Sequence, residues 1–146
     1  MDAAPHLAAT PCTCAMLRRT TRRVTRIYDR ALRPVGLRLT QYSVLAHVAR
    51  GQGLNITDLA GRLATDRSTL TRNLRPLERS GWIRIARGAD PRQRAITLTG
   101  AGRAKYEQAL PLWEAAERDF RRALGSDDVA ALRGLLDRAY LRGSEA

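Results

Sequence analysis

The polar side chains between Asp66 and Gly81 are the residues of this chain best suited to recognising another molecule. Leu70, Leu74 and Leu77 recur at spacings of three and four residues, which predicts a helix with one buried face. The other faces of this helix then carry arginine, hydroxyl and amide groups: Arg67, Ser68, Thr69, Thr71, Arg72, Asn73 and Arg75. Arginine can make two hydrogen bonds to guanine, asparagine can do the same with adenine, and hydroxyls can bond bases or phosphates. These residue types in the first turns of a helix are typical of a helix that enters the major groove of double-stranded DNA.

A second basic group follows in a loop. Residues 82–85 and 95–98 alternate in polarity like the two strands of a hairpin. The loop between them reads RGADPRQR and carries Arg87, Arg92 and Arg94. An arginine on such a loop can enter the minor groove, where A·T-rich tracts concentrate negative potential. Asp90 is expected to order one of these arginines through a charge-assisted hydrogen bond.

Short elements must position these two groups. Asn55 is suited to cap a short helix, Ala64 and Thr65 make a turn, and Asp66 is suited to cap the helix described above. From Asn55 to Thr99 the order is therefore helix, turn, helix, strand, basic loop, strand. This order predicts a winged helix-turn-helix, a DNA-binding module.

Amphipathic helices flank the module in sequence. We expect one from about Cys14 to Leu32, a shorter one over residues 41–50 capped by Thr40, one capped by Thr99 that reaches about Leu124, and a last one capped by Ser126. A module of about 45 residues cannot by itself cover the apolar stripes of the first helix and the last two. We therefore expect part of them to form a twofold dimer, with a purely intramolecular cap as the alternative.

The predicted fold class is thus mainly α (α+β), a winged helix-turn-helix with a small β-hairpin wing. Residues 1–11 are expected to be disordered, and residues 12–146 to form one domain. Within it, DNA binding is assigned to about residues 40–99, and dimerisation to the helices over about 12–33 and 100–143.

The composition agrees with an anionic partner. The chain has 146 residues and a net charge of +12, and all but one of its 26 basic residues are arginines, the exception being Lys105. Such a charge indicates nucleic acid or an anionic membrane surface, although a GC-rich genome also favours arginine codons. No apolar run is long enough to span a membrane and the start of the chain does not resemble a signal peptide, so a cytoplasmic location is expected.

The sequence offers no convincing catalytic, metal-binding or cofactor-binding constellation. His6 and His47 have no acid or nucleophile partner by motif, and there is no glycine-rich phosphate loop. Cys12 and Cys14 are one residue apart, which fits neither a disulfide framework nor a complete zinc site. We expect no enzymatic activity, no metal and no cofactor.

Together these residues resemble the multiple-antibiotic-resistance regulator (MarR) family of transcriptional regulators. The resemblance rests on the run ITDLAGRLATDRSTLTRNLRPLERSGWI, the Asp90-x-Arg92 pair of the wing and the following ITLTGAGR, and it extends over nearly the whole chain. It implies a homodimer that binds a pseudo-palindromic operator, with one helix in a major groove and one wing in the adjacent minor groove. Most such proteins repress their own gene and a neighbouring one. They release DNA when a small phenolic or lipophilic ligand, or an oxidant, reaches the dimer.

The resemblance also points to an effector cleft between the dimerisation helices and the DNA-binding module. A ligand wedged there would move the two DNA-reading helices to a spacing that no longer matches the operator. The alternative is that the candidate residues are ordinary core or interface side chains. The candidates are Cys14, Arg18, Tyr28, Tyr42, His47 and Trp113.

Cys14 supports a redox alternative. It lies at the expected start of the first helix, where the helix dipole and Arg18 favour a thiolate that can be oxidised. The arrangement is similar to the organic-hydroperoxide-sensing branch of the family, in which tyrosines of the partner subunit contact such a cysteine. Tyr28 matches one tyrosine position, whereas Leu39 replaces the other. Cys12 could resolve the oxidised thiol, more plausibly between subunits than within one, and two inert thiols are the opposite interpretation.

Three functions remain open from the sequence: a ligand-released repressor, a redox-sensing repressor, and a non-specific architectural DNA-binding protein. A steep preference for one DNA sequence and release by an effector would favour the first two. Uniform binding to any duplex would favour the third.

Overall fold

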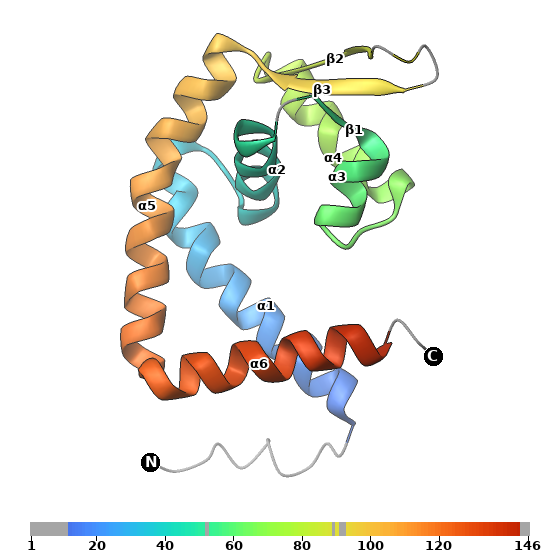
Figure 1. The fold of residues 1–146 in the computed structure, drawn as a ribbon. Coiled ribbons are helices and arrows are strands. Elements are labelled where there is room, and N and C mark those ends of the chain that lie inside the picture. The colour runs from blue at the N-terminus through green and yellow to red at the C-terminus, as the bar shows by residue number, and fades with distance from the viewer. Residues whose placement is uncertain (1–11, 52, 89, 91–92, 144–146) are drawn as a thin grey trace.

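The computed structural model describes residues 12–51, 53–88, 90 and 93–143. Its elements, most of them labelled in Figure 1, follow the predicted order with two additions, the 3-10 turn η2 and strand β1. They are α1 (Thr13–Leu32), the 3-10 turn η2 (Arg33–Val35), α2 (Leu39–Arg50), β1 (Leu54–Asn55), α3 (Ile56–Arg62), α4 (Arg67–Arg79), β2 (Ile83–Arg87), β3 (Arg94–Leu98), α5 (Gly100–Leu124) and α6 (Ser126–Gly143). The expected disorder of residues 1–11 concerns a segment outside the described residues.

Three predicted helix caps are confirmed. The side-chain oxygens of Asn55, Asp66 and Thr99 accept the backbone N–H groups of Asp58, Thr69 and Gly102, at 2.8, 2.8 and 3.0 Å. Each bond satisfies a donor that has no partner within the first turn of its helix. The starts of α3, α4 and α5 are therefore determined by local sequence.

The predicted cap of α2 at Thr40 is wrong. The helix begins at Leu39, with Arg38 in the capping position. The N–H of Leu39 donates to Oδ1 of Asp29 at 2.7 Å, and the N–H of Arg38 donates to Oε1 of Gln41 at 3.0 Å. Because a carboxylate from the preceding helix satisfies the free donor, the helix starts before Thr40 and needs no hydroxyl cap there.

The strands form one antiparallel sheet in the order β1–β3–β2. Ile96 lies opposite Leu54 on one side and Ile85 on the other, so the hairpin expected from the sequence is extended by a third strand. β1 has only two residues, which is too short to show any alternation in the sequence. β1 pairs the chain that precedes α3 with Ala95 and Ile96 of β3, at the base of the wing hairpin.

The core lies between α2, the pair α3 and α4, and the inner face of the sheet, with the end of α1 and the first half of α5 packed against it. Among the described residues, the largest fully buried side chains are Leu32, Leu45, Leu59, Leu70, Leu74, Leu77 and Ile96. Full burial of one such side chain stabilises the fold by about 1.5–3 kcal/mol. In Figure 1, α2 stands between α5 and the layer formed by α3 and α4, with the hairpin extending above them.

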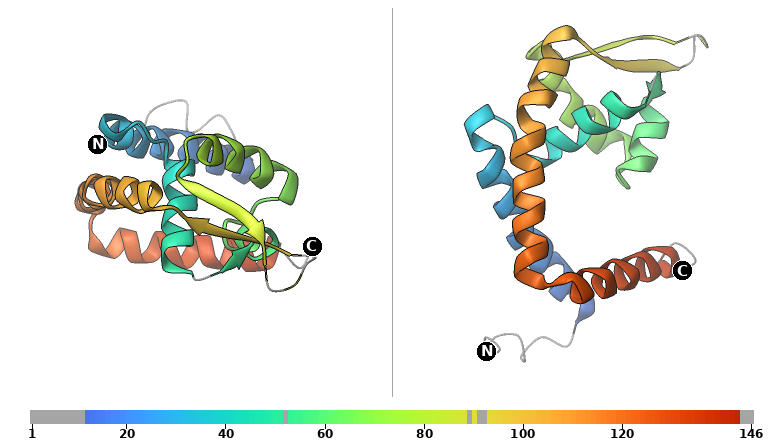
Figure 2. Two further views of the ribbon diagram at one scale, coloured as in Figure 1. Left: turned by 90° about the horizontal axis from the view of Figure 1, so that it is seen from above. Right: turned by 60° about the vertical axis from the view of Figure 1, so that its left-hand side comes forward.

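The remaining helices extend away from this core. α5 runs from the wing to the far end of the molecule, where α6 turns sharply away from it, and α1 runs obliquely from beside α6 up to α5 (Figures 1 and 2). Val129 is the buried residue of α6, whereas large apolar side chains of α1 and α6 stay exposed: Met16, Leu17, Ile27, Leu135, Leu136, Tyr140 and Leu141. Within the described ranges, no helix has both the length and the apolar character that crossing a bilayer requires.

Candidate nucleic-acid interface

Helix α4 separates its side chains as the sequence predicted. Leu70, Leu74 and Leu77 are at most 1% exposed. The predicted DNA-contacting residues of the helix are exposed, except Thr69, which is half-buried: Arg67, Ser68, Thr71, Arg72, Asn73 and Arg75. Five side chains, those of Arg67, Ser68, Thr71, Arg72 and Arg75, line one open groove of about 580 Å³. The structure therefore brings these groups together on one accessible face.

Two hydroxyls on α4 have structural partners. Thr69 Oγ1 donates to Oδ2 of Asp66 at 2.6 Å, in addition to the backbone bond at the same cap. These two bonds hold the pKa of Asp66 below its usual value. Thr71 Oγ1 donates to the carbonyl oxygen of Arg67 at 2.8 Å. Both hydroxyls thus support the helix, and the arginines, Ser68 and Asn73 are left as the groups best placed to contact bases.

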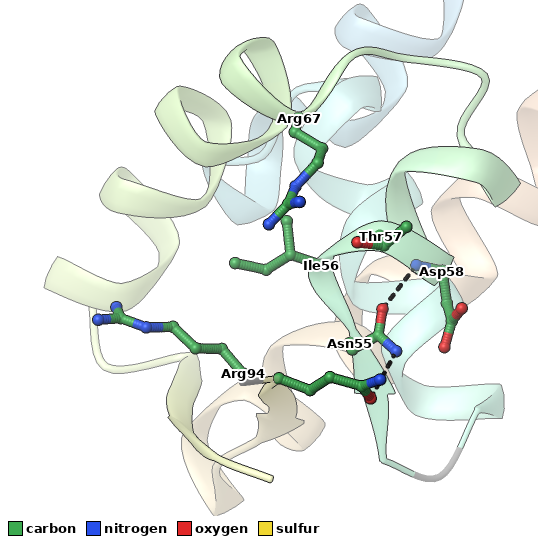
Figure 3. Close-up of a pocket in the computed structure, with 7 residues that line it drawn as sticks. Asn55, Ile56, Thr57, Asp58, Arg67 and Arg94 are labelled. Carbon is green, nitrogen blue, oxygen red and sulfur yellow. Dashed lines mark hydrogen bonds between the residues drawn. The ribbon is translucent and has the colours of Figure 1, made fainter. Parts of the chain in front are cut away.

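A polar hollow lies between α4 and the base of the wing; we call it the wing hollow. Its volume is about 350 Å³, and its lining residues are Asn55, Ile56, Thr57, Asp58, Arg67, Gln93 and Arg94. Figure 3 shows Arg67 reaching in from α4, Arg94 leaving from the start of β3, and Ile56 between them. Nδ2 of Asn55 donates to Oε1 of Gln93 at 3.2 Å, which links the cap of α3 to the wing. Two guanidinium groups on one hollow can hold a phosphate by charge-assisted hydrogen bonds.

The wing itself carries a pair of arginines. Arg87 and Arg94 lie opposite each other where β2 ends and β3 begins, and both are exposed. Like charges directly opposite each other destabilise a strand pair, so an anion close to both would be favourable. Asp90 is exposed and its backbone carbonyl accepts the N–H of Gln93 at 2.9 Å. Its pairing with a wing arginine stays a prediction, and Arg92 lies outside the described residues.

The six candidate residues of the effector cleft fall into separate places. Cys14 and Arg18 are exposed near the start of α1. Tyr28 is 14 residues further along this helix, about 21 Å along its axis at 1.5 Å per residue. Its hydroxyl donates to Oε2 of Glu117 at 2.5 Å. The Nδ1 atom of His47 lies 2.7 Å from the carbonyl oxygen of Ser43. One protomer therefore does not join Cys14 and Tyr28 in a single small cleft.

Tyr42 and Trp113 do lie together. The ring of Tyr42 stacks on Trp113 at 5.5 Å and on Tyr106 at 6.0 Å between centroids. Tyr42 is 3% exposed, and its hydroxyl has no hydrogen-bond partner among the described residues. Burial raises the pKa of this hydroxyl to about 12. A buried hydroxyl without a partner is costly, so a ligand that offered it a hydrogen bond would be favoured.

Two residues near the interface were missed as site residues. Asn55 was expected only as a helix cap, and Gln93 was not singled out, yet the two are hydrogen-bonded to each other beside the wing hollow. They are 38 positions apart. No pattern among neighbouring residues could therefore have predicted the hydrogen bond between Asn55 and Gln93. In the part of the chain that the structure describes, no three His, Cys, Asp or Glu side chains are grouped so that they could hold a metal ion.

Comparison with known proteins gives matches over the module and over nearly the whole chain. The family model described as the MarR family matches residues 37–91. The crystal structure of the Mycobacterium tuberculosis transcriptional regulator MosR in complex with DNA is 38% identical, with a TM-score of 0.74 over 88% of this chain and 98% of that chain. The transcriptional repressor CouR bound to a 23-mer DNA duplex is 27% identical, with a TM-score of 0.82 over 96% of this chain and 99% of that chain.

A curated relative gives a shorter match. The uncharacterized HTH-type transcriptional regulator YwoH of Bacillus subtilis (strain 168) is 27% identical over 92 residues, which are 63% of this chain and 67% of that protein. This chain spans 61% and 40% of the lengths of two further curated regulators that it matches.

Proposed function

The chain belongs to the MarR family of transcriptional regulators, and from this membership we propose that it is a sequence-specific repressor that binds its operator as a homodimer. As a member of the family it is a DNA-binding transcriptional regulator and not an enzyme. The observation that carries the proposal is the exposed face of α4, which presents three arginines in one groove beside the wing hollow. MosR and CouR, its relatives of known structure, are each crystallised with DNA.

On a duplex, α4 would lie in the major groove and the wing in the adjacent minor groove. Arg72 and Asn73 would contact base edges, and Arg87 and Arg94 would approach the minor groove. The sugar–phosphate strand that separates the two grooves would then pass over the wing hollow. Phosphate contacts of this kind fix the register of a protein on DNA, while base contacts provide the sequence preference.

The dimer is supported by the exposed apolar residues of α1 and α6. Leu135, Leu136 and Tyr140 are 43–61% exposed, and Val129 is the buried residue of α6. A second copy of the chain would cover these side chains and give a twofold assembly. We assign dimerisation to the terminal helices and DNA binding to residues of about 40–99. The operator would then be a pseudo-palindrome with half-sites about one helical turn apart.

Release by a small phenolic or lipophilic effector is supported by the aromatic group around Tyr42. Its hydroxyl could bond a polar atom of the ligand, while the rings of Trp113 and Tyr106 would contact an apolar one. Tyr42 is on α2, which packs between α5 and the DNA-binding layer. A ligand lodged there would change the position of α4 only if it binds the DNA-free arrangement more tightly.

A redox-sensing repressor is the second candidate. Both thiols are exposed, with Cys12 in the capping position of α1 and Cys14 in its first turn. A thiolate there would attack an organic hydroperoxide, cleave its O–O bond and form a sulfenic acid with release of the alcohol. A second thiol would then displace water and form a disulfide. Peroxide-induced release that is lost in Cys14→Ser would favour this candidate over a ligand.

Fluorescence anisotropy on DNA from upstream of the protein's own gene tests the proposed function, with a scrambled duplex as control at one fixed salt concentration. We expect the native fragment to be bound more tightly by a factor of about 10³ or more. The same complex can then be titrated with phenolic ligands or peroxide. Equal affinity for native and scrambled DNA, repeated over the neighbouring promoters, would instead favour a non-specific architectural protein.

A further inference from the structure

We propose that the corner between α1 and α2 is a third DNA-contact surface, which binds the phosphate strand at the edge of α4 opposite the wing. We call it the α1–α2 corner and define it by Arg30, Arg33 and Arg38. The proposal rests on the function proposed above and extends its interface beyond the recognition helix and wing. None of these three residues was a candidate from the sequence.

The corner is continuous with the interface through shared residues. The wing hollow shares Arg67 with the groove on the outer face of α4, and that groove shares Arg72 with a notch of about 150 Å³. The notch is lined by Arg38, Thr40, Gln41, Arg72, Asn73 and Pro76. Arg38 and Gln41 also line a wider groove of about 600 Å³, together with Asp29, Arg30, Arg33, Gly36 and Leu37. A surface of linked hollows therefore runs from the wing, across α4, to the end of α1.

Helix geometry places the two ends of this surface on opposite sides of α4. At 100° per residue, Arg72 lies near the middle of the exposed face, Arg67 at one edge and Asn73 at the other. Arg67 lines the wing hollow, and Asn73 lines the notch beside Arg38. The α1–α2 corner is thus at the edge of α4 that the wing does not reach.

The corner carries three arginines and one acidic residue, Asp29, so its net charge is positive. Arg30, Arg33 and Arg38 are exposed, and within the described residues no carboxylate forms an ion pair with them. Asp29 is the acidic residue of the groove, and its Oδ1 atom already accepts the N–H of Leu39 at 2.7 Å. The three guanidinium groups are therefore available to an anion.

The backbone of the corner is held in place. Gly36 has a φ of +71°, a left-handed conformation that ends the 3-10 turn and directs the chain into α2. Nζ of Lys105 on α5 donates to the carbonyl oxygen of Val35 at 3.1 Å. A rigid surface loses little entropy on binding, so its arginines can add to affinity.

Duplex DNA fits this arrangement because the major groove, about 12 Å wide, is bordered by two phosphate strands. With α4 in the groove, one strand passes between α4 and the wing, and the other passes at the opposite edge. An open surface continuous with α4 suits this second strand. Contacts to it would add affinity and salt dependence without adding sequence preference.

The test is the double variant Arg30→Ala/Arg33→Ala, measured on the operator as a function of salt. With two phosphate contacts removed from each subunit of the dimer, the slope of log K against log salt should fall by about 3.6, and the affinity lost between about 50 and 200 mM salt should shrink about 150-fold. The ratio of native to scrambled binding should not change. Hydroxyl-radical footprinting should show loss of protection on the strand bordering the major groove away from the wing.

Two variants serve as controls. Arg30→Lys/Arg33→Lys keeps both charges, so it should keep the salt slope of the wild type. Arg122→Ala removes a surface arginine whose side chain is 78% exposed and which lies 3.6 Å from Asp119, outside the linked hollows. It should leave both slope and footprint unchanged, and circular dichroism should show that all variants are folded.

The outcomes separate the two proposals. If the wild type prefers its operator while the alanine variant keeps its slope and footprint, the α1–α2 corner does not bind DNA and the proposed function stands. If the alanine variant keeps the salt slope and the footprint of the wild type, but inorganic phosphate binds only the wild type, the corner is a small-anion site and the inference is wrong. If the wild type shows no sequence preference, the proposed function itself fails.

Discussion

The hydroxyl of Tyr28 on α1 donates to Oε2 of Glu117 on α5 at 2.5 Å, and the other oxygen of that carboxylate accepts a 3.0 Å hydrogen bond from Arg133 on α6. One carboxylate thus joins the three helices that we assign to dimerisation. Tyr28 is 7% exposed. Burial and the bond to Glu117 raise its pKa well above the usual range, so the hydroxyl remains protonated and donates.

Tyr28→Phe should lower the free energy of unfolding by about 1 kcal/mol, because it removes this hydrogen bond and little volume. Urea denaturation at neutral pH measures the difference. A group whose pKa is raised by folding contributes its stability below the unfolded pKa of about 10 and loses it at higher pH. The difference in the free energy of unfolding between wild type and variant should therefore decrease as the pH rises above 10. A difference that stays constant would mean that the bond does not determine the contribution of Tyr28.

The parts of the fold that the sequence predicted are those set by neighbouring residues. The buried face of α4 and the caps at Asn55, Asp66 and Thr99 depend on contacts within four positions, and they were correct. The start of α2 was wrong because it depends on Asp29, ten residues away. The link from Tyr28 to Glu117 spans 89 positions, and no periodicity can indicate such a pair.

The candidate site also has one part that is set by neighbouring residues and one part that depends on residues distant in the sequence. Exposure of the polar groups of α4 follows from its leucine spacing, so that surface was predictable residue by residue. The wing hollow and the α1–α2 corner exist because β1 joins the sheet and because η2 turns the chain at Gly36. Both are tertiary arrangements, and their arginines look in the sequence like any others in an arginine-rich chain.

The cap of α4 should respond to acid. Hydrogen bonds from Thr69 depress the pKa of Asp66, so its contribution is present above the unfolded pKa of about 4 and is lost as the pH falls through the lower folded value. At neutral pH, Asp66→Asn should melt at a lower temperature than the wild type, because asparagine caps the helix without the charge. The difference should disappear in acid. A difference in melting temperature that stays constant over the whole pH range would show that the charge of Asp66 contributes nothing to stability.

Arg72→Ala should weaken operator binding by about 1–3 kcal/mol and blur the preference at one base position. The reason is its central place on the exposed face of α4, where a bidentate contact to guanine is possible. Anisotropy on a set of single-base operator variants measures this. Arg79→Ala, at the last residue of α4 and outside the linked hollows, is the matched control. An equal loss on random DNA would make Arg72 a phosphate contact instead.

Tyr42→Phe should raise the free energy of unfolding by about 1 kcal/mol, since it removes a buried hydroxyl that lacks a partner among the described residues. Because burial raises the pKa of Tyr42 to about 12, the wild type should also lose stability as the pH rises from 10 towards 12, and the variant should lose less. The variant should in addition need more of a phenolic effector to release DNA. A variant less stable than the wild type would indicate that the hydroxyl has a favourable interaction in the folded protein.

Gly102 is where α5 begins against the end of the wing, and a side chain there should be strongly destabilising. A Cβ atom would lie 1.8 Å from the carbonyl oxygen of Trp82, which also accepts the N–H of Thr99 at 3.1 Å. Neither backbone can move without breaking the cap of α5, so Gly102→Ala should cost about 3 kcal/mol or more. Gly100→Ala is the matched control, since no atom lies within 4 Å of its Cβ position, and it should be neutral or stabilising by up to about 1 kcal/mol. Urea denaturation of both variants measures the two effects, and similar stabilities would show that the close approach of α5 to Trp82 is not required for the fold.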